Sequence, residues 1–112
     1  MSLILTCEIN ADALPHLTSL RAQHLEYIQA HRSEILFGGP ARDENGIPQT
    51  MIIVLATDDT TAAREFVASE PYTASGKVFA SVSIRPWSQV IPEPTPGALD
   101  AAIADERAKA SS

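Results

Sequence analysis

Hydrophobic positions along this chain follow a period of two in some stretches and a helical period in others. Residues 2–9 form a short apolar run rich in β-compatible side chains, which predicts a first strand. Residues 49–57 form a second run that is apolar on both sides, which predicts a central strand. Residues 77–91 alternate apolar and polar side chains, which predicts a long last strand with Pro86 at an edge or bulge.

Two stretches between these strands have the helical period. Residues 13–32 predict a helix, with Asn10 and Asp12 as capping residues and Pro15 in its first turn. Residues 60–69 predict a second helix, capped by Asp58 or Asp59. The residue before a proline is disfavoured in helical conformation, so we expect Pro71 to end this helix and residues 70–72 to form its exit corner.

A hairpin is expected between the two helices. Residues 34–37 predict a short strand, and residues 43–46 predict the hairpin tip, because Asn-Gly favours a tight turn. Between them, Gly38, Gly39 and Pro40 predict a bend or bulge. Two interpretations stay open: a kink that lets the hairpin twist, or the wall of a site with exposed backbone donors.

The element order is strand, helix, strand, strand, helix, strand. Two interleaved βαβ units of this kind form one antiparallel four-stranded sheet with both helices on one face, the α+β ferredoxin-like fold. The first and third strands are apolar on both sides, so the other sheet face needs a cover, and we expect a homodimer through facing sheets. This domain is predicted over residues 1–91, followed over residues 92–112 by a proline-rich linker and a helical tail.

Charge and composition exclude several functions. The formal net charge of −6 argues against nucleic acid or anionic membranes as partners. No apolar run reaches membrane length, so the expected location is the cytoplasm. The single cysteine, Cys7, lies in the first apolar run and is expected to be a buried, inert thiol. No Cys/His spacing suggests a structural zinc site, and we expect no cofactor.

The most informative position is His24, in the middle of the first predicted helix. At 100° per residue it falls near the centre of the apolar stripe. A titratable imidazole there must find a partner or lose its charge. Two interpretations stay open: a catalytic base, or a core histidine bonded to a carbonyl or carboxylate. The stripe and its flank contain Leu14, Leu17, Leu20, Arg21, Tyr27 and Ile28.

Four motifs, in order, resemble the YciI-related family, from the first strand to about Val90. The resemblance implies a ferredoxin-like protomer that forms a dimeric α+β barrel, with an architecture similar to that of muconolactone isomerase. One characterised branch of the family removes HCl from a chlorinated hydroxyhydroquinone. The motifs are Arg21-x-x-His24-x-x-Tyr27, Gly38-Gly39-Pro40, Glu70-Pro71-Tyr72 and Val-Ser-Ile-Arg-Pro-Trp over residues 82–87.

The resemblance also implies an active-site pair. His24 and Glu70 correspond to the family's histidine and carboxylate, although the family usually has aspartate where this chain has Glu70. In such a pair the carboxylate orients the ring while the other nitrogen takes a proton from substrate. This chemistry suits a small lyase or isomerase acting on a cyclic or aromatic-derived molecule.

Other residues are candidates for substrate binding. Arg21 can hold an anionic oxygen or form a structural salt bridge with Glu70. Tyr27 or Tyr72 can donate a hydrogen bond to an oxyanion, although packing in the core is the alternative for Tyr27. The backbone of Gly38, Gly39 and Pro40 can line the pocket. The competing hypothesis is a non-catalytic dimeric barrel that binds a small molecule or serves as an interaction module.

Overall fold

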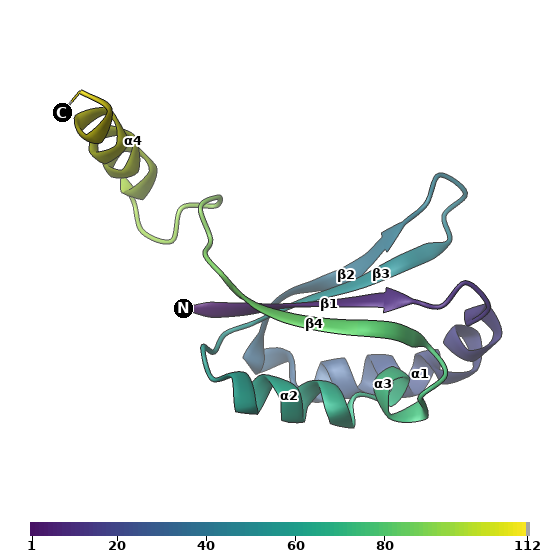
Figure 1. Ribbon diagram of the computed structural model, residues 1–112. Helices are drawn as coiled ribbons and strands as arrows, with labels where there is room; N and C mark the ends of the chain where they lie inside the picture. The colour runs from purple at the N-terminus through teal and green to yellow at the C-terminus, as the bar shows by residue number, and fades with distance from the viewer. Residues whose placement is uncertain (112) are drawn as a thin grey trace.

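One antiparallel four-stranded sheet carries three helices on a single face in the computed structural model, which describes residues 1–111 (Figure 1). The strand order is β2-β3-β1-β4, so β2 and β4 are the edges. The strands are β1 (Ser2–Ile9), β2 (Ile35–Arg42), β3 (Pro48–Leu55) and β4 (Phe79–Trp87). The helices are α1 (Leu14–Ala30), the 3-10 turn η1 (Arg32–Glu34), α2 (Thr60–Ser69), α3 (Pro71–Ser75) and α4 (Ala98–Ala110).

The period of two in β1 divides its side chains between the two faces of the sheet. Leu3, Leu5 and Cys7 are buried beneath the helices. Leu5 lies opposite Ile53 on β3 and opposite Ile84 on β4, and directly opposed residues share one face. The core therefore lies between the inner strands and α1, α2 and α3.

The same register places a second apolar set on the sheet face that carries no helix. We call this set the open face: Ile4, Phe37, Ile52, Val54 and Trp87. The rings of Phe37 and Trp87 meet edge to face, with centroids 6.0 Å apart. Phe37 nevertheless remains 46% exposed, so this face presents a large aromatic side chain to its surroundings.

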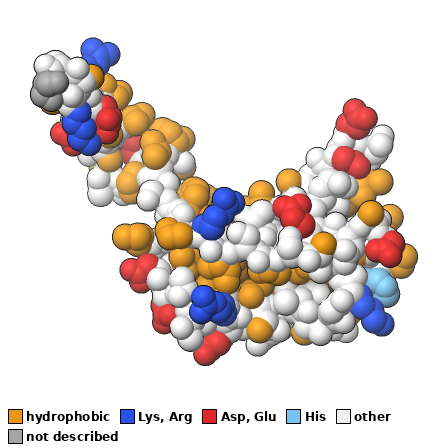
Figure 2. Space-filling view, in the orientation of Figure 1, with side chains coloured by type: hydrophobic (Ala, Val, Ile, Leu, Met, Phe, Trp, Pro, Cys, Tyr) orange, Lys and Arg blue, Asp and Glu red, His pale blue; other side chains and the backbone are white. Residues whose placement is uncertain are grey.

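The C-terminal helix α4 stands apart from the sheet and the other helices (Figure 1). The helix follows the linker after β4, and it lies on the side of the sheet opposite α1, α2 and α3. Hydrophobic side chains gather along it in Figure 2, which also shows acidic side chains at the tip of the β2–β3 hairpin. None of the helices within residues 1–111 has the length and apolar character needed to cross a bilayer.

One prediction about glycine and proline was wrong, and another was incomplete. Gly38, Gly39 and Pro40 do not bend out of the sheet; they lie within β2, which continues to Arg42. An edge strand tolerates proline because its outward N–H has no partner to lose. Pro71 does end α2, but it also begins the short helix α3, because the missing N–H of proline costs nothing in a first turn.

Element ends differ elsewhere by a few residues. The first helix begins after Ala13, which has no side-chain cap, and it ends at Ala30. Asp59 is the residue that caps α2, accepting from the amides of Thr61 and Ala62. The last strand is shorter than predicted, and its Pro86 lies on an edge strand as expected.

Cys7 is buried as predicted, and we expect it to resist alkylation in the folded protein. Burial, with smaller contributions from Glu70 and Glu8, raises the pKa of its thiol from 9.0 to about 12. A raised pKa leaves less of the reactive thiolate at any given pH, here by about a thousandfold. Mass spectrometry after iodoacetamide treatment at mildly alkaline pH should find Cys7 unmodified when folded and modified in guanidinium chloride. Rapid modification of the folded protein would contradict this expectation.

Candidate active site

His24 and Glu70 meet in the interior although they lie far apart in the sequence. His24 lies on the same core-facing stripe of α1 as Leu17, and the residue is only 6% exposed. Glu70, at the junction of α2 and α3, is 2% exposed. His24 Nδ1 lies 2.5 Å from Glu70 Oε1, so the extra methylene of glutamate does not prevent the contact.

The other oxygen of Glu70 fixes the carboxylate in place. Glu70 caps α3, and its Oε2 accepts from the backbone N–H of Thr73 at 3.2 Å and from Thr73 Oγ1 at 3.4 Å. An ionised carboxylate accepts all of these bonds, so we assign the Nδ1 proton of His24 as the donor to Oε1. That assignment leaves Nε2 as the atom of His24 with a free lone pair.

The Nε2 atom of His24 is free to meet a ligand. It has no hydrogen-bond partner among residues 1–111. Within these residues, however, every buried side-chain nitrogen and oxygen does have a hydrogen-bond partner. Nε2 must therefore reach accessible surface. His24 also lines the cavity described below, so the cavity is where this surface lies.

Tyr72 holds the imidazole from one side. Its ring stacks on His24 with centroids 4.2 Å apart and planes inclined by 13°. Its hydroxyl donates to the carbonyl of Leu17 at 3.3 Å. Burial, and then the charge of Glu70, raises the pKa of Tyr72, and Arg21 opposes the shift. The hydroxyl therefore stays protonated, and it already donates its hydrogen bond to a carbonyl of α1.

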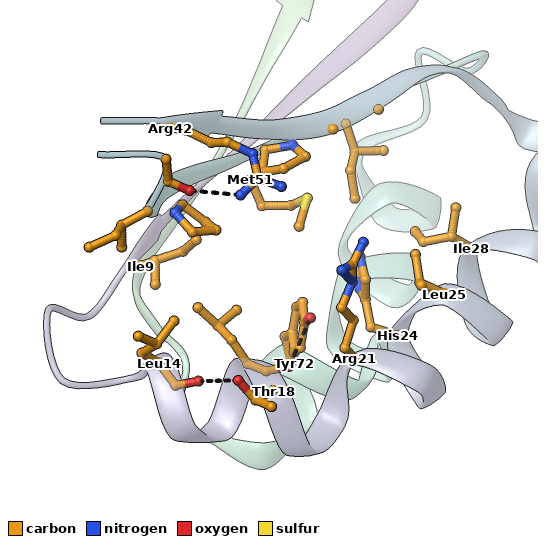
Figure 3. A pocket seen from close by; sticks show the side chains of 18 of the residues that line it. Ile9, Leu14, Thr18, Arg21, His24, Leu25, Ile28, Arg42, Met51 and Tyr72 are labelled. Atoms are coloured by element: carbon orange, nitrogen blue, oxygen red, sulfur yellow. Dashed lines mark hydrogen bonds between the residues drawn. The ribbon is translucent and has the colours of Figure 1, made fainter. Parts of the chain in front are cut away.

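A cavity of about 560 Å³ opens between α1 and the β2–β3 hairpin, and Figure 3 shows His24 and Tyr72 on its wall. This volume lies in the usual range for small-molecule sites. Glu70 is not part of the lining, because it lies behind His24. Among residues 1–111, no group of three or more His, Cys, Asp or Glu side chains is arranged to hold a metal ion. The lining consists of Ile9, Leu14, Leu17, Thr18, Arg21, His24, Leu25, Ile28, Ile35, Gly38, Gly39, Pro40, Arg42, Gly46, Ile47, Pro48, Met51, Ile53 and Tyr72.

Two arginines give this apolar cavity its charge. Arg21 lies one helical turn before His24 on α1, and Arg42 lies at the end of β2. Neither arginine forms an ion pair within the described part of the chain, so the alternative of a structural salt bridge from Arg21 to Glu70 is not realised. An anionic group is what such a wall can bind.

Comparison with known proteins decides the family. A sequence profile of the YCII-related domain matches residues 1–88. The chain belongs to the YCII-related family. The linker and α4 lie beyond the matched region. No curated protein matches the chain significantly.

Solved structures share the fold of this YCII-related protein. The 5-chloro-2-hydroxyhydroquinone dehydrochlorinase of Burkholderia phenoliruptrix, solved with 2,5-dihydroxybenzoquinone, has a TM-score of 0.72 and 19% identity, over 80% of this chain and 95% of that one. An antibiotic biosynthesis monooxygenase-like protein of Bacteroides thetaiotaomicron has a TM-score of 0.53 and 13% identity, over 85% and 93%. At these identities the comparison confirms the predicted ferredoxin-like fold of dimeric α+β barrel proteins.

The YCII-related motifs do not all converge on the cavity. Gly38, Gly39 and Pro40 line it, as the second interpretation of this motif anticipated. Tyr27 does not line it: its hydroxyl donates to the carbonyl of Phe66 at 2.7 Å. Burial raises the pKa of Tyr27, so this hydroxyl also stays protonated. The ring of His31 packs on both Tyr27 and Phe66.

Sequence reasoning missed Arg42. The bend expected at residues 38–40 placed the end of the strand before Arg42, whereas β2 continues to Arg42, with an irregularity in its pairing just before that residue. Thr73, which fixes the carboxylate of Glu70, gave no signal in the sequence, because its role depends on Pro71 beginning a new helix.

Proposed function

We propose that this YCII-related protein is a small lyase or isomerase in which His24 is the general base and Glu70 orients it. The observation that carries the proposal is the position of one imidazole between two environments. Its Nδ1 is bonded to a buried carboxylate, while its Nε2 reaches a cavity large enough for a substituted ring. This is the arrangement that general-base catalysis needs.

The proposed chemistry is proton abstraction from an activated ring. Nε2 of His24 takes a proton from a ring carbon or hydroxyl, and the electron pair that this frees forms a new double bond. In an elimination, a halide leaves with its bonding electrons; in an isomerisation, the proton returns at another carbon. Glu70 stabilises the imidazolium, and Arg21 holds an anionic oxygen of the substrate. The dehydrochlorinase that shares this fold catalyses a reaction of the first kind.

The low exposure of His24 favours one competing function, a binding module without catalysis. A core histidine whose hydrogen bond is satisfied is also buried and also faces a carboxylate. The two functions differ in turnover. Purified protein should release chloride from 5-chloro-2-hydroxyhydroquinone, or isomerise an unsaturated lactone, measured by ion chromatography and absorbance. Saturable binding of these compounds without turnover would support the binding module instead.

We also propose that the protein is a homodimer through the open face. Its apolar side chains and the exposed ring of Phe37 support this arrangement, since an exposed apolar sheet face marks an interaction surface. Phe37→Glu is therefore expected to convert the dimer to a monomer, as measured by analytical ultracentrifugation. Val82→Glu is the matched control, because Val82 is comparably exposed but opposes Cys7 on the other face. A Phe37→Glu protein that stays dimeric would contradict the interface.

A further inference from the structure

We propose that Arg21 and Arg42 bind two anionic oxygens of one substrate from opposite walls of the cavity. The substrate class is then a planar ring that carries two ionised oxygen groups, such as a dihydroxyquinone or a ring dicarboxylate. This inference rests on the proposed function and makes its substrate more specific. It adds Arg42, a residue outside the family motifs, as a determinant of specificity.

The distribution of charge supports the proposal. The chain has 14 acidic residues against 8 Lys and Arg, yet no Asp or Glu side chain within residues 1–111 lines the cavity. Both charged side chains on the lining are arginines. The charge of the cavity wall is therefore positive, although the net charge of the protein is negative. The rest of the lining is mostly apolar, so these two cations are the groups that can attract an anion into the cavity.

Arg42 is held in place before any ligand arrives. Its Nη1 donates to the carbonyl of Gly46 across the hairpin turn at 2.9 Å, which leaves its other N–H groups free. The nearest acid along the chain, Asp43, is engaged within the turn: its Oδ1 accepts from the amides of Asn45 and Ile47, both at 2.9 Å. A guanidinium fixed in this way loses less entropy when it binds an anion.

The two arginines approach from different elements. Figure 3 shows Arg21 rising from α1 beside His24, and Arg42 on the strand that forms the facing wall, near Met51. A ligand with one anionic group can pair with only one of the two arginines. A ring with two such groups can span the cavity and satisfy both, and its carbon atoms would then lie over apolar side chains near His24.

The test measures binding without turnover. Isothermal titration calorimetry would compare two dianions, 2,5-dihydroxybenzoquinone and terephthalate, with the monoanion benzoate. Arg42→Gln is expected to weaken dianion binding by about tenfold or more, the usual loss for a charge-assisted hydrogen bond, and to narrow the preference for dianions over benzoate. Arg42→Lys should recover part of the affinity, because it restores the charge. Arg64→Gln, on the exposed side of α2, should bind like the wild type.

Two results would overturn the inference. One is a wild-type protein that binds neither dianion more tightly than benzoate. The other is an Arg42→Gln variant that keeps wild-type affinity for a dianion that the wild type does bind. Because no turnover is involved, these results are independent of whether His24 is a base. A His24 variant that keeps full turnover would refute the proposed function and leave the anion preference standing.

Discussion

His24→Asn is expected to lower kcat by about 10²–10⁴-fold, the usual contribution of a general base. Asparagine can still donate to Glu70 from near the position of Nδ1, so the buried carboxylate keeps a partner. It offers no basic atom at the position of Nε2. The measurement is kcat and KM for halide release or lactone isomerisation, on protein shown to be folded by circular dichroism.

The control for this experiment lies on the same helix. His16→Asn changes a histidine of α1 that does not line the cavity, and it should keep wild-type kinetics. A loss confined to kcat in His24→Asn supports a role in the chemical step, whereas a rise in KM alone indicates lost binding. A folded His24→Asn protein with wild-type kcat would rule out the general base.

Glu70→Ala is expected to lower the free energy of unfolding by about 2–4 kcal/mol, because it removes a charge-assisted hydrogen bond to buried His24, worth about 1.5–3 kcal/mol, and a helix cap worth about 1 kcal/mol. Both side chains are nearly inaccessible, so solvent does not screen the loss. The substitution leaves Nδ1 of His24 without its acceptor and removes the cap of α3. Proteins of this size are stable by roughly 5–15 kcal/mol, so the effect should be obvious in urea denaturation.

Two further variants separate the causes of that loss. Glu70→Gln keeps one acceptor oxygen, which can serve either His24 or Thr73, so it should cost less than Glu70→Ala. Glu65→Ala, on the exposed side of α2, should change stability by less than about 0.5 kcal/mol. If Glu70→Ala destabilises the protein no more than Glu65→Ala does, the pair makes no net contribution to stability, and its contact is not a structural constraint.

The fold was largely predictable because its signals are local. The apolar run over residues 2–9 and the helical period over residues 60–69 match β1 and α2 residue for residue, since both patterns are properties of the local sequence. The prediction was wrong at Gly38 and Pro40, and at Pro71 it missed the helix α3 that begins there. There the conformation depends on position in the sheet or chain: an edge strand accepts a proline that a central strand would exclude, and a helix accepts one in its first turn.

The candidate site was only partly predictable. A place on the apolar stripe of α1 is a local property, so the sequence alone determined that His24 faces the interior. The partners of His24 in the interior are not a local property of the sequence. Periodicity indicates which way a side chain points, but it does not indicate which residues pack against it. The packing of α2 and α3 against α1 brought Glu70 and Tyr72 to the imidazole, and the course of β2 brought Arg42 to the cavity. Only the tertiary structure could decide those partners.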